Sequence, residues 1–446
     1  MVLNWLFNRG QSKLPKNFRE LIDSDALKIV DQLQRAGFKS YLVGGCVRDL
    51  ILGKKPKDFD IATSATPNQV KVIIPRSFII GRRFRIVIAK RRPHGISAKQ
   101  SLNDWTRLFP MHQDRAPERE FQITTFRREP EKHQDRINEN VFGSPKDDAL
   151  RRDFTINALF LDPSNGEIVD FTDGMKDIAA KKLKIIGDPM ERFAEDPIRI
   201  LRAIRFQLRT TFQFDAKTRS SLESSVPKLA EAKRERIREE FFKALREGHS
   251  FSFFQQLEKF GAWKIISPEF GSYFSKEHKY FEKLSKALER FPWARNTQGP
   301  LIFLVLQRLF DTPPADRIIG KILEDLKISK AEVDDLTQIR SLLSKALKDE
   351  NATAPDKILR PIPKFFESQI QAFYCFMILA EVNEGRCHEA WKRWISVWES
   401  FSQRGSKSMG SERSHGSPRR RTRRGSNPSR RPAISKKAPS APSENQ

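Results

Sequence analysis

Cysteine is almost missing from this chain: only Cys46, Cys375 and Cys387 occur among its 446 residues, and there is no CxxC pair. This scarcity excludes a disulfide framework and a cysteine-based zinc site. Long apolar runs are also missing, because no stretch approaches the roughly 18–20 residues of a membrane-spanning helix. The apolar part of the opening segment is too short for a signal peptide. We therefore expect a soluble, cytoplasmic protein without a membrane span.

Acidic residues are few relative to basic ones. Lysine and arginine total 82 against 56 aspartates and glutamates, which gives a formal net charge of +26. Residues 404–446 hold 12 basic and two acidic residues, so this segment carries +10 and the rest of the chain +16. Such an excess indicates a polyanionic partner, either nucleic acid or an anionic lipid surface. The densest basic cluster of the segment supplies the candidate RNA-binding residues Arg419, Arg420, Arg421, Arg423 and Arg424.

The hydrophobic pattern predicts fold class α+β, with strand signals in the first part of the chain and helical signals after about residue 176. A helix is expected over residues 24–36. The expected strands are 41–43, two short strands within 78–90, 121–127, and a hairpin formed by 159–161 and 167–171. A mixed sheet with helices should therefore precede a long helical region.

Changes in composition divide the chain into five expected parts. They are an N-terminal extension (1–23), a mixed α/β head (24–176) with an inserted loop (91–118), a helical neck (177–250), a helical RNA-binding body (251–403), and a basic tail (404–446). The tail is rich in glycine, serine, proline and arginine, a composition typical of disorder.

Two adjacent glycines, Gly44 and Gly45, stand where a predicted strand turns into a predicted helix. Glycine lets backbone N–H groups approach a phosphate closely, and a helix N-terminus favours an anion. Arg48 is spaced to reach the same anion. A tight corner without any ligand is the other interpretation of this turn.

The segment Asp58-Phe59-Asp60 places two carboxylates at positions i and i+2, which share one face if the segment is a strand. Carboxylates held together repel each other unless a cation neutralises them, and hard oxygen ligands suit Mg²⁺. A solvated loop would explain this motif in isolation. Its position shortly after the glycine turn favours a metal site instead.

A third acidic residue, Asp153, follows Arg151 and Arg152. A two-metal phosphoryl-transfer site often uses a third acid to complete the metal cage or to take a proton from the attacking hydroxyl. The alternative is a surface ion pair, which stabilises little.

Near the start of an expected helix, Asp196, Arg199 and Arg202 recur every three residues and would share one helix face. Together they could present an acceptor and donors to the edge of a base. Asp196 as a simple helix cap is the alternative.

These four segments, in this order, resemble the class II tRNA nucleotidyltransferase/poly(A) polymerase family of the polymerase-β superfamily, over about residues 24–250. The bacterial poly(A) polymerase branch is the more similar one, on the motifs KKPKDFDIATSATPNQV, GRRFR and NVFGSPKDDALRRDFTIN and on the arginine-rich tail. Two features depart from that branch. Gln122 stands where the branch usually carries a glutamate, and the insertion at 91–118 is longer than typical.

The resemblance implies a polymerase-β-like nucleotidyltransferase head in which Asp58 and Asp60 hold two Mg²⁺ ions and Asp153 is the third catalytic acid. ATP is the implied substrate. The implied nucleotide-binding residues are Gly44, Gly45, Arg48, Arg151, Arg152, Asp196, Arg199 and Arg202. The implied reaction is template-independent transfer of AMP from ATP to RNA 3′ ends, with release of pyrophosphate, in RNA turnover.

The expected partners are RNA 3′ ends, including those of mRNA, small RNA and decay intermediates, and RNA-decay or RNA-chaperone proteins; the chain is expected to be a monomer. A CCA-adding tRNA nucleotidyltransferase is the alternative with the same fold. A non-catalytic RNA-binding protein that retains the fold is the alternative of another class. The pair Asp58/Asp60 argues against the latter, because paired carboxylates without a metal only reduce stability.

Overall fold

The computed structural model describes most of the chain up to residue 348 and a short stretch beyond it. The described residues are 14, 16–81, 85–91, 119–128, 142–290, 298–310, 315–348, 375 and 378–382. The expected inserted loop from residue 92 onward and the whole basic tail, with its five candidate RNA-binding arginines, lie outside these residues.

A seven-stranded mixed sheet forms the centre of the head, with strand order β3-β4-β5-β2-β1-β6-β7 among the described residues. All neighbouring strands in it are antiparallel except β2 and β5, which run parallel. Its strands are β1 (Ser40–Val43), β2 (Asp60–Thr63), β3 (Ser77–Ile80), β4 (Ile86–Arg91), β5 (Arg119–Thr125), β6 (Leu159–Leu161) and β7 (Ile168–Asp170).

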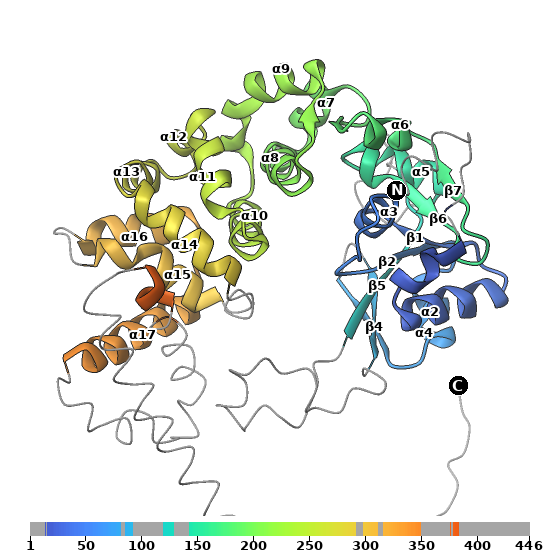
Figure 1. Cartoon of the computed structure of the whole chain (residues 1–446), viewed down its shortest axis with the longest axis horizontal. Helices are drawn as coiled ribbons and strands as arrows, with labels where there is room; N and C mark the ends of the chain where they lie inside the picture. Colours follow the sequence, from blue (N-terminus) through green and yellow to red (C-terminus); the bar gives the residue numbers. More distant parts are fainter. Residues whose placement is uncertain are drawn as a thin grey trace, which may run out of the picture. The chain divides into compact units, whose positions relative to one another are not determined.

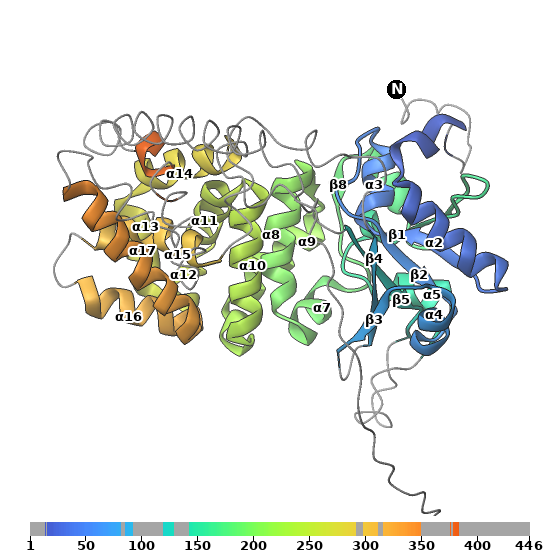
Figure 2. The same ribbon diagram turned by 90° about the horizontal axis from the view of Figure 1, so that it is seen from below.

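Short helices connect and cover these strands, and their starts follow local capping rules. They are η1 (Lys16–Leu21), α2 (Ser24–Arg35), α3 (Gly45–Ile51), α4 (Pro67–Ile73), α5 (Pro145–Leu150), η4 (Thr155–Asn157) and α6 (Gly174–Ala179). Thr66 and Ser144 each form a reciprocal capping box, and a proline follows each at the first helical position. Helices α2 and α4 contact each other and lie along one side of the strands (Figure 2).

Helices dominate the described chain after the head (Figure 1). They are α7 (Pro189–Glu195), α8 (Ile198–Thr210), α9 (Ala216–Ser225), η5 (Val226–Glu231), α10 (Arg234–Glu247), α11 (Ser250–Lys259), α12 (Trp263–Ile266), α13 (Pro268–Lys276), α14 (His278–Arg290), α15 (Gln298–Leu306), η7 (Gln307–Leu309), α16 (Ala315–Asp325) and α17 (Lys330–Lys348). Two short strands, β8 (Lys182–Leu183) and β9 (Gln213–Phe214), pair in parallel at the start of this region.

The two faces of the head sheet differ in what covers them. Ile61, Ile123 and Leu42 point to the face that joins the large core with α2, α3 and α4. On the opposite face, Val43 and Ala62 belong to a smaller cluster that includes Ala149 of α5. Its complete buried membership is Val43, Ala62, Phe126, Ala149, Ala158, Phe160 and Ile186.

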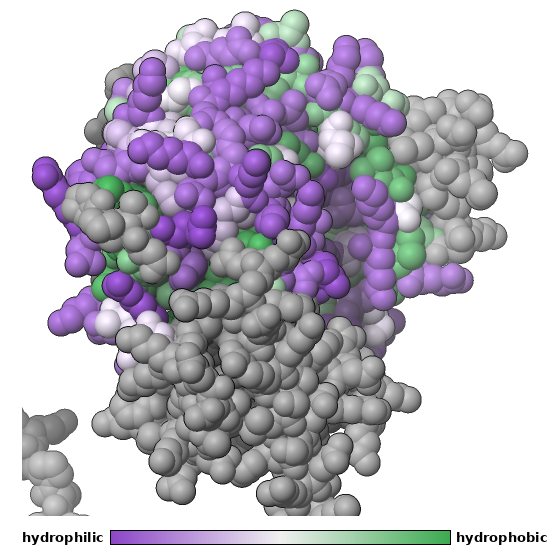
Figure 3. Space-filling model, turned by 60° about the vertical axis from the view of Figure 1, so that its left-hand side comes forward, coloured by the Kyte–Doolittle hydropathy of each residue, from purple (hydrophilic) through white to green (hydrophobic). Residues whose placement is uncertain are grey.

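The outer surface is mainly hydrophilic, as the high content of charged residues suggests. On the side drawn in Figure 3, hydrophilic side chains prevail over the described residues and hydrophobic ones form small separate patches. Within the described ranges, no helix has both the length and the apolar composition that crossing a membrane requires.

The expected fold class is confirmed, with a mixed sheet and helices in the head and helices after it. The helix over 24–36 and the hairpin of 159–161 with 167–171 are also found, with shifts of one or two residues. Two conditions of the sequence interpretation are not met. Strand β2 begins at Asp60, so Asp58 precedes the strand, and α8 begins at Ile198, so Asp196 lies between two helices. The strands β8 and β9 were not expected, because two residues carry no detectable periodicity.

Candidate functional site

The turn at Gly44 requires glycine. Its φ of 80° lies in the region that side chains disfavour, and a Cβ atom there would stand 3.3 Å from the Nη1 atom of Arg152. Helix α3 starts at the next residue, Gly45. The predicted strand–turn–helix arrangement is therefore present, and the turn lies against an arginine.

Arg48 supports this turn from inside the protein. Its side chain is 1% exposed, and it donates hydrogen bonds to Asn157 Oδ1 at 2.6 Å and to Asp49 Oδ1 at 2.7 and 3.0 Å. Burial lowers the pKa of Arg48, and the charge of Asp49 opposes this shift. In this structure Arg48 thus holds α3 to Asn157.

Asp58 and Asp60 are both exposed, and neither accepts a hydrogen bond or forms an ion pair with a described side chain. The surrounding protein atoms raise the pKa of Asp60; the charge of Asp58 raises it further, and that of Arg152 lowers it. A carboxylate that is disfavoured in its charged form and has a second carboxylate beside it is suited to a cation. These two residues therefore fit a divalent metal ion.

Neither Asp153 nor Cys46 adds a ligand to Asp58 and Asp60 in this structure. Within the described ranges, no group of three or more histidine, cysteine, aspartate or glutamate side chains could hold a metal ion. Asp153 is thus not brought together with Asp58 and Asp60 as a third ligand in this structure. The thiol of Cys46 is also unsuited, because burial raises its pKa to about 12 and keeps it neutral.

Arg152 lies between the glycine turn and an internal acid. Its guanidinium donates to Asp148 Oδ2 at 2.9 and 3.1 Å and to the carbonyl of Asn157 at 3.3 Å. It also stands over the ring of Phe160, 5.4 Å from the centroid. Arg151 donates to the other oxygen of Asp148 at 3.2 Å. The buried Asp148 therefore fixes both arginines of the predicted nucleotide-binding segment.

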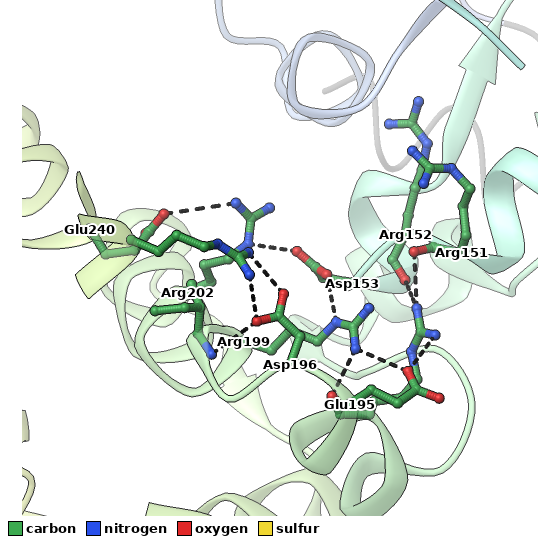
Figure 4. Close-up of polar contacts among 11 residues, drawn as sticks. Arg151, Arg152, Asp153, Glu195, Asp196, Arg199, Arg202 and Glu240 are labelled. Atoms are coloured by element: carbon green, nitrogen blue, oxygen red, sulfur yellow. Dashed lines mark hydrogen bonds and ion pairs between the residues drawn. The ribbon is translucent and has the colours of Figure 1, made fainter. Parts of the chain in front are cut away.

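Asp153 is held by two arginines of α8. Arg199 Nε donates to Asp153 Oδ1 at 3.0 Å, and Arg202 Nε donates to Oδ2 at 2.6 Å (Figure 4). Burial by itself would raise the pKa of Asp153, but the charges and hydrogen bonds of Arg202 and Arg199 lower it below its usual value. Figure 4 shows the side chains of Arg151 and Arg152 turned away from this contact. Asp153 therefore connects the head to the predicted base-reading helix.

Asp196 pairs with Arg236 of α10 and not with Arg199 or Arg202. Both of its oxygens accept hydrogen bonds from Arg236 of α10, at 2.7 and 2.8 Å. Its Oδ1 also accepts the backbone N–H of Ile198 at 3.3 Å, while Pro197 occupies the N-cap position of α8. Asp196 and the two arginines of α8 thus do not form one common face, because Asp196 precedes the helix.

Two acids that hold arginines of α8, Glu240 and Glu247, were not expected from the sequence. Arg205 donates to Glu240 at 2.8 Å and to Glu247 at 2.6 Å, and the side chains of Arg205 and Glu240 are both buried. Arg209 extends this series, with Glu247 at 3.6 Å and Asp49 of the head at 3.7 Å. A signal existed: Arg199, Arg202, Arg205 and Arg209 recur every three or four residues, as expected for one face of a helix.

Comparison with known sequence families now adds to this geometry. Residues 40–184 match the family described as Poly A polymerase head domain, and residues 211–274 match the family described as probable RNA and SrmB-binding site of polymerase A. The first match includes the glycine turn, Asp58 and Asp60.

Curated relatives of two kinds are similar to the chain. Poly(A) polymerase I of Haemophilus influenzae is 35% identical over 262 residues, which is 58% of this chain and 55% of the relative. A CCA-adding enzyme of Enterococcus faecalis is 37% identical over 235 residues, which is 52% of this chain and 50% of the relative. The chain thus spans about half the length of these relatives. It belongs to the nucleotidyltransferase family that includes poly(A) polymerases and CCA-adding enzymes.

Solved structures share the fold at lower sequence identity. The crystal structure of the Bacillus stearothermophilus CCA-adding enzyme in complex with CTP superposes with a TM-score of 0.56 at 23% identity, covering 84% of this chain and 82% of that one. A tRNA nucleotidyltransferase complexed with a primer tRNA and an incoming ATP analogue gives a TM-score of 0.51 at 20% identity, covering 85% and 99%.

Proposed function

We propose that the protein transfers AMP from ATP to RNA 3′ ends, without a template and with release of pyrophosphate. The observation that carries this function is the unpaired couple Asp58/Asp60 beside the Gly44 turn and Arg152. Relatives of the same family are named for adding adenylate or CCA to RNA, which supports RNA as the acceptor.

Asp58 and Asp60 are the residues that would hold the metal ions, two Mg²⁺ by the family resemblance. When bound, the metal would lower the pKa of the RNA 3′-hydroxyl and neutralise the triphosphate. The chain itself contributes position and charge: Arg152, fixed by Asp148, lies beside the turn where the triphosphate would bind. Holding the reactants in place supplies most of the rate in this class of reaction.

We assign Asp153 a positioning role in the selection of the base. Its two oxygens each hold one arginine of α8, and Arg236 holds Asp196 in the same region. Arginines held in this way would present fixed donors to the edge of an incoming base. The preference for adenylate is proposed from the similarity to Poly(A) polymerase I.

The basic charge supports RNA binding along the body by contacts with phosphates that do not depend on sequence. We extend this proposal to the five tail arginines, which would add affinity through charge. The same proposal places the protein in RNA turnover in the cytoplasm. Its substrates would be mRNA, small RNA and decay intermediates, and its partners RNA-decay or RNA-chaperone proteins.

Incubation with single nucleotides tests the function directly. The full chain would be given Mg²⁺ and either a generic RNA or a tRNA that ends before its CCA, with each NTP alone and then all four together. Long extension of the generic RNA with ATP alone is the expected result, and Asp58→Ala should abolish it. Incorporation of C into the tRNA followed by a stop after CCA would show a CCA-adding enzyme. Binding of RNA without any incorporation would show the non-catalytic alternative.

A further inference from the structure

A continuous row of side chains crosses the head sheet through Asp60. In the strand register, Asp60 is directly opposite Gln122 of β5, Gln122 is opposite Ile88 of β4, and Ile88 is opposite Phe78 of β3. Residues that lie opposite each other in neighbouring strands point to the same face of a sheet. The side chain of Phe78 therefore shares a face with the catalytic carboxylate, three strands away, or about 14 Å at the usual strand spacing.

This face has a covered half and an open half. On the β1 and β6 side of Asp60, the residues of the face belong to the small buried cluster that contains Val43 and Phe160. On the other side the face is exposed at three positions, with Phe78 55% and Ile80 49% accessible and Gln122 exposed as well, whereas Ile88 between Gln122 and Phe78 is 9% accessible. Because the opposite face of the sheet carries the large core, these side chains are open to a ligand rather than turned away from one.

The direction of the reaction assigns the open half to the acceptor. The Gly44 turn and Arg152, at which the triphosphate would bind, lie on the covered side of Asp60, and the guanidinium of Arg152 stands over Phe160. In phosphoryl transfer, the attacking and the leaving oxygens are roughly in line on opposite sides of the phosphorus. With the triphosphate at the Gly44 turn, an attacking hydroxyl on the far side of the phosphorus would lie toward β5, β4 and β3.

The open half also has the chemistry that binds single-stranded nucleic acid. An exposed aromatic ring can stack on any base, and basic residues beside it can contact phosphates. Arg76 directly precedes β3, stands two residues before Phe78 and is exposed. Gln122 is neutral and therefore places no further negative charge between the carboxylates and this surface.

We propose that Phe78 and Ile80 form a platform on which the last nucleotides of the acceptor RNA lie when the 3′-hydroxyl reaches Asp58 and Asp60. The platform rests on the proposed function, since it requires an RNA acceptor. It predicts tolerance of different bases at the RNA end, because ring stacking and apolar contact do not read hydrogen-bonding groups. Phe78 and Ile80 are thus positioning residues for the RNA end.

Steady-state kinetics of the full chain test the platform through Phe78→Ala. Loss of one stacked base should raise KM for a generic RNA roughly fivefold to a hundredfold, while KM for ATP stays within about twofold. Phe78→Trp, which keeps an aromatic ring, should retain a KM for RNA near that of the wild type. Val72→Ala is the matched control, because Val72 is an exposed apolar residue of α4, which covers the opposite face of the sheet.

A second measurement separates the platform from the activity. RNA with 4-thiouridine near its 3′ end would be photo-cross-linked to the protein in the presence of Ca²⁺ and a non-hydrolysable ATP analogue. A cross-link to the segment that contains Phe78 is expected even if no nucleotide is transferred, so failure of the proposed reaction and failure of the platform are distinguishable. Equal rises in KM for RNA and for ATP, an unchanged KM for RNA, or a cross-link confined to other segments would overturn the platform.

Discussion

The head contains two carboxylate sites that differ in almost every physical respect. Asp58 and Asp60 are exposed, have no described hydrogen-bonding partner, and include a group whose pKa is raised. Asp153 is mostly buried, has an arginine on each oxygen, and has a lowered pKa. The negative charge of an unpaired couple is unfavourable until a cation binds. The negative charge of Asp153 is already balanced by arginines of the protein. We therefore propose a metal-binding role for the first site and a positioning role for the second.

The largest effect is expected from Asp60→Asn. Loss of one metal-binding carboxylate should reduce AMP incorporation by about 4 kcal/mol of transition-state stabilisation, roughly a thousandfold. The metal-free protein should keep its stability at neutral pH or gain some, because a raised pKa means that the charged form of Asp60 is disfavoured by folding. Single-turnover rates and thermal unfolding of the same preparation measure the two effects. A large loss of stability together with the loss of activity would contradict an open metal site.

Glu240→Gln should cause the largest loss of stability. It removes a buried charge that pairs with Arg205 and with Lys243 and lies 3.8 Å from Arg202, so the free energy of unfolding should fall by about 3 kcal/mol. Glu223→Gln is the matched control: Glu223 pairs with Arg219 on the surface, and its loss should change stability by less than about 1 kcal/mol. Urea unfolding followed by circular dichroism gives both values, and equal losses would show that the arginine series of α8 is not a buried network.

Asp153→Asn should reduce activity less than Asp60→Asn and should change nucleotide selection rather than metal binding. Arg199 and Arg202 would lose a charged partner, which corresponds to about 2 kcal/mol and a roughly thirtyfold lower kcat/KM for ATP. Discrimination against the other nucleotides should weaken, while the Mg²⁺ dependence should remain that of the wild type. A shifted Mg²⁺ dependence would instead support Asp153 as a third metal-binding acid.

The same variant has a pH signature. Because the folded-state pKa of Asp153 is lowered, its contribution to stability is present above the ordinary aspartate pKa and is lost as the pH falls through the lowered value. The stability difference between wild type and Asp153→Asn should therefore shrink as the pH is lowered from neutrality to about 3. Unfolding measured across this range would show no such convergence if the two ion pairs did not form in solution.

The smallest effect is expected from Gln122→Glu, which would add a third carboxylate directly opposite Asp60. An extra charge near the metal should strengthen binding by about 1 kcal/mol, so the Mg²⁺ concentration for half-maximal activity should fall roughly fivefold. Titration of activity with Mg²⁺ measures this shift. An unchanged or higher requirement would show that Gln122 lies outside the reach of the metal site.

The sequence predicted the strands of the head apart from β2, and the motif positions, because β-branched runs, glycines and paired acids leave local signals. It could not predict which acid would pair with which arginine. Asp153 and Arg199 are 46 residues apart, and Asp196 and Arg236 are 40 apart, so these contacts depend on the packing of α8 and α10. The same limit explains the difference at Asp196: it was expected at the start of the helix, whereas α8 begins at Ile198 and Asp196 pairs with Arg236 of α10.

Manganese binding tests the contrast between the two carboxylate sites most directly. Mn²⁺ would be titrated into wild type, Asp60→Asn and Asp153→Asn in the presence of a non-hydrolysable ATP analogue, with bound ions counted by electron paramagnetic resonance. We expect Asp60→Asn to lose protein-dependent Mn²⁺ binding and Asp153→Asn to retain the wild-type stoichiometry and affinity. Loss of binding in Asp153→Asn with full binding in Asp60→Asn would contradict the assignment of the metal to the unpaired couple.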